Sequence, residues 1–161
     1  MVLYHYSTNA ILVEPIKSQQ DSDMIRAYNN LLNKITKHNK LPTIHYMDNE
    51  ASAAFRANFK SPFQLVPPHT HRRNAAEVAI KTFKQNFIGI FSGTRKLFHL
   101  HLWCRLLPQT EMTLNMLQPC CSDPTISAYK AINGPFNYNA TPLSILVCNA
   151  LTHEKLHQRK T

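Results

Sequence analysis

The chain has 161 residues, 43% of them hydrophobic, which suits one globular domain with a sizeable core. Its three glycines are too few for the glycine-rich phosphate loops of Rossmann and P-loop proteins, so those classes are excluded. Eighteen Lys and Arg against nine Asp and Glu give a net charge of +9, which favours a polyanionic partner such as a nucleic acid. The alternative is a protein that is basic without binding a polyanion.

The sequence shows no segment that would carry the chain into or across a membrane. No apolar run approaches the ~20 residues of a membrane span. The first residues lack the basic region and the small-residue cleavage site of a signal peptide. We therefore expect an intracellular protein without a membrane partner.

A hairpin and a long helix are predicted first. Residues 1–6 and Ala10–Val13 are apolar, and the turn signal at residues 7–9 favours an antiparallel pair of strands. Asp21 or Ser22 can cap a helix of roughly 17 residues. Its apolar residues recur at helical spacing: Met24, Ile25, Tyr28, Leu31, Leu32 and Ile35.

Strands and helices then alternate. The predicted segments are a strand over residues 43–47, a helix over 51–59, a strand over 63–66 and a helix over 71–87. A further helix is predicted over residues 100–117, and Pro108 should kink or split it. From Pro119 onward we expect loops, with a late strand over residues 146–150. This order predicts an α/β fold with a mixed sheet.

Two carboxylates stand out in this order. Asp48 directly follows a predicted strand, at the sheet edge where ligands of α/β proteins collect, unless it caps the next helix. Glu77 lies in the first turns of its helix, where the helix dipole and Lys81 would also stabilise a purely structural carboxylate. One carboxylate at a strand end and one on a helix are how metal-dependent nucleic-acid enzymes hold Mg²⁺.

The helix that carries Glu77 is predicted to have a basic face. Glu77, Lys81 and Lys84 follow each other at i, i+4 and i+7, so they share one side of the helix. This pattern suits a metal ligand beside a phosphate backbone, and the alternative is a solvated basic face. Four side chains before the helix add donors for phosphate oxygens: His69, His71, Arg72 and Arg73.

The four cysteines form no C-x₂-C pair, so we interpret them as structural thiols. His99, His101 and Cys104 have a spacing from which a zinc site could be drawn. Their alternation with leucine instead favours an element that packs one face.

Several segments together resemble the integrase catalytic core of LTR retrotransposons, a member of the retroviral-integrase superfamily. In chain order they are STNAILVEPIKS, IRAYNNLL, MDNEAS, FQLVPPHTHRRNAAEVAIKTFK, LHLWCRLLPQTEMTLNML and SAYKAINGPFNYNATPL. They cover nearly the whole chain, and HRRNAAE and LVPP are the most specific. The resemblance implies an RNase H-like fold, a mixed sheet flanked by helices. It also implies a partial catalytic core at residues 1–118 and a loop-rich, truncated carboxyl-terminal extension at residues 119–161.

The resemblance also implies a chemistry. This family uses an Asp, Asp and Glu triad that binds two Mg²⁺ (or Mn²⁺) ions, and Asp48 and Glu77 match the second Asp and the Glu, as catalytic residues and metal ligands. Lys81 and Lys84 match helix positions that contact DNA. The implied activity is DNA integration by metal-dependent polynucleotidyl transfer, with element ends and target DNA as partners. An active integrase would work in the nucleus, and related integrases act as multimers, which implies a homo-oligomer.

The departures from the family matter equally. The family's first catalytic Asp lies on a strand upstream of the hairpin, and this chain begins after it. We therefore expect the sheet to lack its first strand, which leaves two open strand edges. We also expect the chain by itself to be catalytically impaired or inactive, although the family consists of enzymes. The alternative is a non-catalytic nucleic-acid-binding remnant of a mobile element.

Overall fold

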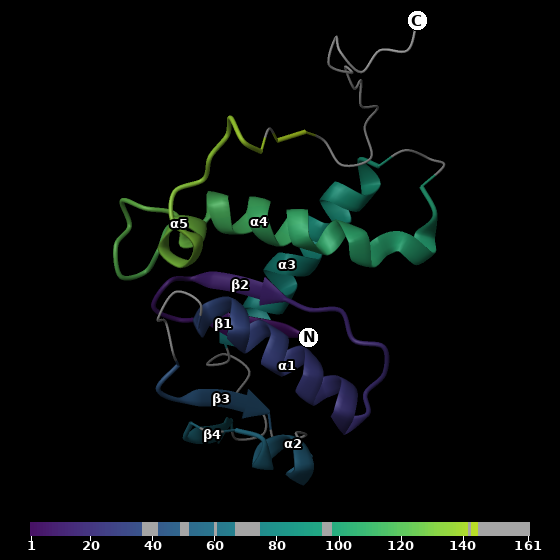
Figure 1. Cartoon of the computed structure of the whole chain (residues 1–161), viewed down its shortest axis with the longest axis vertical. Helices are drawn as coiled ribbons and strands as arrows, with labels where there is room; N and C mark the ends of the chain where they lie inside the picture. The colour runs from purple at the N-terminus through teal and green to yellow at the C-terminus, as the bar shows by residue number, and fades with distance from the viewer. Residues whose placement is uncertain are drawn as a thin grey trace, which may run out of the picture.

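The computed structural model describes residues 1–36, 42–48, 52–59, 61–66, 75–94, 98–141 and 143–144 (Figure 1). Within these ranges the chain is mixed α/β, as predicted. The elements are β1 (Val2–His5), β2 (Ala10–Val13), α1 (Asp21–Thr36), β3 (His45–Asp48), α2 (Ala53–Ala57), β4 (Phe63–Val66), α3 (Ala75–Ser92), the 3₁₀ helix η2 (Leu100–Leu106), α4 (Leu107–Leu117) and α5 (Ala128–Asn133). No described helix is long and apolar enough to span a membrane.

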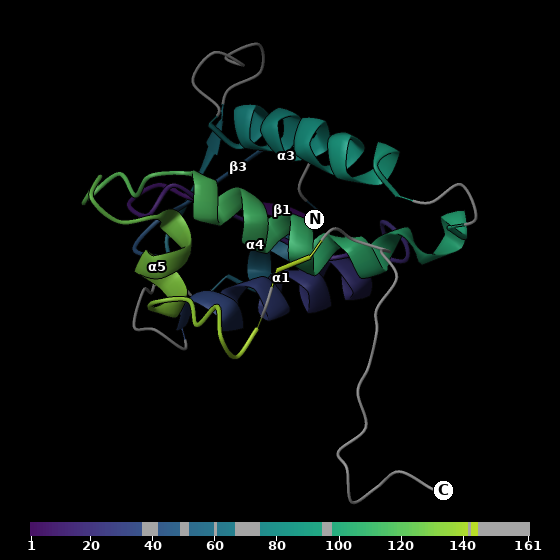
Figure 2. The same cartoon turned by 90° about the horizontal axis from the view of Figure 1, so that it is seen from above.

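The predicted hairpin is confirmed and forms the middle layer of the molecule. β1 and β2 pair antiparallel, and the turn between them contains Asn9 with a left-handed φ of 58°. All four residues of β2 are buried. Ala10 and Leu12 pack against α1 and α5, whereas Ile11 and Val13 pack against α3 and α4. In Figure 2, α1 and α3 accordingly lie on opposite sides of β1.

Helix α1 follows the predicted pattern closely. Asp21 and Asp23 in its first turn suit the positive end of the helix dipole, and Lys34 in its last turn suits the negative end. The buried residues share one face: Ala27, Tyr28, Leu31 and Ile35. This face covers one side of the hairpin, which explains why the apolar spacing predicted the helix correctly.

β3 and β4 form a second, parallel pair, with His45 opposite Phe63 and Asp48 opposite Val66. The prediction was one mixed sheet. Among the described residues there are instead two separate two-stranded sheets, one antiparallel and one parallel. Both an antiparallel and a parallel pair of strands are therefore present, as in a mixed sheet, but within the described residues no hydrogen-bonded ladder joins the two pairs.

Of the two later helices, the first is longer than predicted and the second is divided as predicted. Helix α3 was predicted to end at Phe87 but continues to Ser92. The buried residues of the whole helix are Ala79 and Phe83. Pro108 divides the predicted helix over residues 100–117 into η2 and α4, as expected, because proline fits the first turn of a helix but not its interior.

Helix α5 was not predicted, because residues after Pro119 were expected to be loops. Ser127 caps it by accepting a hydrogen bond from Lys130 N at 3.1 Å, and Gly134, with a φ of 79°, ends it. Its buried residues, Ala128 and Ile132, complete the packing against β2 and α1. Six residues are less than two helical turns, which is too short for a helical period to be detected in the sequence. The late strand predicted over residues 146–150 lies outside the described residues.

Candidate functional site

A cavity of about 1170 Å³ lies between the two sheets. β1 lines it on one side and β3 on the other, and α1, α2 and α3 each contribute side chains. Two open strand edges were predicted from the sequence at this point. The cavity is larger than a typical small-molecule pocket and is bordered by strands of both sheets.

Glu77 lies on the wall of this cavity. It is a partly buried residue in the first turn of α3, and its neighbour Ala76 and Ile80 on the following turn line the same space. The i, i+3 spacing of Glu77 and Ile80 directs both side chains to one face. The helix thus presents one carboxylate and two small or apolar side chains to the cavity.

Asp48 is the last residue of β3, whereas it was predicted to follow directly after this strand. Its neighbour Met47 and its paired residue Val66 both line the cavity that Glu77 lines. The strand end that carries Asp48 and the helix turn that carries Glu77 therefore border one space. The predicted convergence of the two carboxylates concerns the Asp48 side chain, which lies outside the described part of the structure, so it stays a prediction.

The alternative role for Asp48, capping the helix that follows, is wrong. The N-cap of α2 is Ser52, whose hydroxyl accepts a hydrogen bond from Phe55 N at 3.0 Å. Ser52 Oγ also donates to a carboxylate oxygen of Asp21, which ties the start of α2 to the start of α1. The capping requirement of α2 is met without Asp48.

The basic face of α3 is present in part. Lys81 and Lys84 are exposed, and neither forms an ion pair within the described ranges. Exposed ammonium groups without acidic partners remain available to phosphate oxygens. Arg72 and Arg73, with His69 and His71, were predicted to extend this face, and all four lie outside the described residues.

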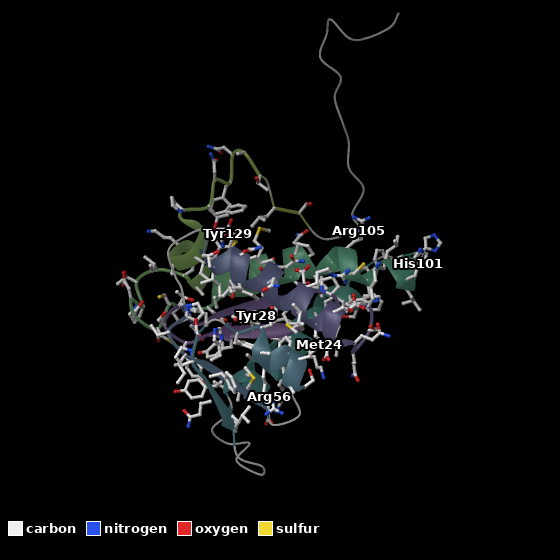
Figure 3. The ribbon with its side chains drawn as sticks, turned by 60° about the horizontal axis from the view of Figure 1, so that its bottom comes forward. Met24, Tyr28, Arg56, His101, Arg105 and Tyr129 are labelled. Carbon is white, nitrogen blue, oxygen red and sulfur yellow. The ribbon has the colours of Figure 1, made fainter. Side chains whose placement is uncertain are left out.

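An aromatic cluster that was not predicted from the sequence forms another wall of the cavity. Tyr28 of α1, labelled in Figure 3, places its hydroxyl 3.2 Å from His45 Nε2 on β3. The Tyr28 and Phe59 rings lie 4.4 Å apart between centroids. Burial raises the pKa of Tyr28 to about 12 and lowers the pKa of His45. Burial thus disfavours the charged form of both side chains, which suits an apolar wall.

The side chains that could act as metal ligands can be compared with what a metal ion requires. Among the described residues, no three His, Cys, Asp or Glu side chains gather closely enough to form a ligand cluster, and His99 and His101, whose rings lie 5.5 Å apart, belong to none. Mg²⁺ is commonly held by one or two carboxylates and several waters. The chemistry of Asp48 and Glu77 thus fits a single divalent cation.

Comparisons with known proteins add no family to these observations. No protein-family model matches this chain, and no match was found among curated proteins.

Proposed function

We propose that this chain is a partial integrase catalytic core with an RNase H-like fold, whose basic α3 face binds DNA and whose chemistry is impaired because residues 1–161 match only two of the family's three catalytic carboxylates. The observation that carries the proposal is the shared cavity. Glu77 lines it, the strand end at Asp48 borders it, and the open edges of two sheets face it.

The arrangement of strands supports the fold part of the proposal. In Figure 1 the arrows of β2 and β3 point the same way, and β1 is antiparallel to β2. A strand placed in the cavity parallel to β3 would therefore run antiparallel to β1. It would join the two pairs into one mixed sheet with helices on both faces, which is the architecture that the resemblance implies.

Asp48 and Glu77 would hold the divalent cation, Mg²⁺ or Mn²⁺. When bound, such an ion supplies charge stabilisation and an activated oxygen for phosphodiester chemistry. The family's site has three carboxylates, and the residues matched in this chain, Asp48 and Glu77, would supply two of them. We therefore expect this chain alone to perform only weak strand transfer, whereas a non-catalytic remnant would perform none.

Lys81 and Lys84 would contact the DNA backbone beside this site. The net charge of +9 favours DNA without reference to its sequence, because each neutralised phosphate releases counterions. The partners would be element ends and target DNA, in the nucleus. The second candidate, a non-catalytic nucleic-acid-binding remnant, needs only these exposed lysines.

A strand-transfer assay with Mn²⁺ or Mg²⁺ on a labelled DNA end tests the enzyme. Metal-dependent products that disappear in Glu77→Gln would show that the chain retains integrase chemistry. If the chain binds DNA in a salt-dependent way and forms no product with either ion, the chain is a non-catalytic nucleic-acid-binding remnant. Absence of both DNA binding and transfer would refute the proposal as a whole.

A further inference from the structure

One long stretch of the chain contains no carboxylate. Between Glu77 and Glu111 the sequence has no Asp or Glu, whereas five Lys or Arg and two His fall within this stretch. The same stretch holds five large aromatic residues: Phe83, Phe87, Phe91, Phe98 and Trp103. Positive charge and aromatic rings are thus interleaved in one continuous segment.

The structure brings the helices of this stretch together at one end of the molecule. The Phe87 ring of α3 meets the Trp103 ring of η2 edge to face, with 6.3 Å between the centroids and 85° between the planes. This contact holds η2 beside the later turns of α3. In Figure 3, His101 and Arg105 of η2 lie towards one edge of the molecule.

The first turns of η2 leave large apolar side chains in solvent. Leu100 is 70% exposed and Trp103 is 43% exposed, and Ile88 on α3 is 64% exposed. Where η2 joins α4, by contrast, Leu106 and Leu107 are buried in the core. Single exposed apolar residues need no explanation, but a group of them marks a binding surface.

The charged groups that α3 and η2 place around this surface are cations. Lys84 lies one turn before the ring that contacts Trp103, and Arg105 lies two positions beyond Trp103. Neither cation forms an ion pair within the described ranges. Glu111, the next acidic residue along the chain, is occupied by Lys34 at 3.1 Å. A polyanion would therefore be attracted to this surface.

The aromatic ring identifies the class of polyanion. In duplex DNA the bases stack on each other and present only their edges in the grooves, so a protein ring has no base face to contact. Unpaired bases present their faces, and stacking on an aromatic side chain stabilises their binding whatever their sequence. The exposed part of Trp103 can take an unpaired base while the flanking cations bind the adjoining phosphates.

We propose that η2 and the adjoining part of α3 bind single-stranded nucleic acid, with an unpaired base stacked on Trp103 and phosphates bound by Lys84 and Arg105. Leu100 contacts the base or sugar of a neighbouring nucleotide through its apolar surface. This surface uses neither of the two predicted catalytic carboxylates and needs no metal ion. The inference therefore does not rest on integrase chemistry, and it adds an unpaired strand to the duplex contact proposed for the basic face of α3.

The sole tryptophan of the chain reports on this surface directly. Oligothymidylate, titrated into the full chain, is expected to quench Trp103 emission, because a stacked base contacts the indole ring. A duplex of the same length is expected to leave the emission unchanged. Equal quenching by the duplex would overturn the proposal. A blue shift with anionic phospholipid vesicles would instead assign the surface to a membrane, and a blue shift with rising protein concentration alone would assign it to a second copy; either would overturn the proposal.

Variants separate stacking from charge. Trp103→Ala is expected to weaken oligothymidylate binding about tenfold in fluorescence anisotropy, and Trp103→Phe, which keeps a ring, less than about threefold. Arg105→Gln is expected to reduce the slope of log K against log salt by about 0.7, the value for one phosphate contact on a single strand. The matched control Tyr138→Ala removes an exposed ring elsewhere and is expected to bind as the unchanged chain does.

Oligothymidylate binding that is unchanged in both Trp103→Ala and Arg105→Gln would overturn the proposal. Circular dichroism shows whether each variant is folded, and if Trp103→Ala is not, the quenching of the unchanged chain and the salt slope of Arg105→Gln decide. Duplex binding is expected to be the same in Trp103→Ala as in the unchanged chain. Failure of this inference is therefore distinguishable from failure of the proposed function, which is tested by duplex binding and strand transfer.

Discussion

Asn115 gives Ile11 the hydrogen bonds that a neighbouring strand would otherwise supply. The Asn115 amide donates to Ile11 O and accepts from Ile11 N, at 2.9 Å in each case, across 104 positions of sequence. Both residues are buried, so water cannot replace either bond. The pair holds α4 to the edge of the hairpin.

Asn115→Ala is expected to lower the free energy of unfolding by about 2–4 kcal/mol, because two buried backbone groups would lose their partners. Urea unfolding followed by circular dichroism measures this change. Asn133→Ala, at an exposed position on α5, is the matched control and is expected to cost less than about 0.5 kcal/mol. Equal losses for the two variants would show that the Asn115 bonds contribute little.

The charge beside Asn115 gives a second prediction. Lys34 Nζ lies 3.1 Å from Glu111 Oε2, and burial raises the pKa of Glu111 while Lys34 partly offsets the shift. Lys34→Met would leave a mostly buried carboxylate without its cation. We expect a loss of about 1–2 kcal/mol in unfolding free energy at pH 7.

The sign of the pH effect in Lys34→Met follows from the raised pKa. A carboxyl with a raised folded pKa binds its proton more tightly in the folded chain, so its destabilising effect disappears as the pH falls through that pKa. The loss caused by Lys34→Met should therefore shrink between pH 7 and pH 4, as measured by urea unfolding at each pH. The double variant Lys34→Met/Glu111→Gln should recover most of the stability at pH 7, and failure to do so would mean that lost packing dominates.

His45 predicts a different pH dependence. Burial lowers the pKa of His45, so the unfolded chain takes up a proton near pH 6.5 while the folded chain does not. Stability is therefore lost as the pH falls below about 6.5. His45→Gln should flatten this part of the profile between pH 7.5 and pH 5. A slope that stays unchanged in His45→Gln would contradict the role of burial.

The exposed lysines of α3 predict the salt dependence of DNA binding. Lys81→Glu/Lys84→Glu should weaken binding to a duplex of any sequence and reduce the slope of log K against log salt by about 2. Fluorescence anisotropy at several salt concentrations gives both quantities. Lys130→Glu, on α5, changes the net charge at another exposed site and should have a smaller effect on the slope. If the unchanged chain, the α3 double variant and Lys130→Glu all gave the same slope, α3 would be excluded as the surface that contacts DNA.

Elements that depend on residues close together in the sequence could be predicted from the sequence alone. The apolar runs of the hairpin, the helical spacing of α1, the strand Phe63–Val66 and the break at Pro108 all depend on neighbours within a few positions, and all four are confirmed. Placing Asp48 at a strand end and Glu77 in the first turn of a helix required no more than this.

Contacts between distant segments decided the rest. The closed edge of β2, the burial of α5 against α1 and the division of the strands into two pairs each depend on residues that meet only after folding. Hydrophobic periodicity reports which face of an element is buried, but not which segment covers it. From the sequence alone, a polar residue such as Asn115 would be assigned to the exposed face of its helix. Only the tertiary structure brings it beside the backbone of Ile11, with which it forms hydrogen bonds.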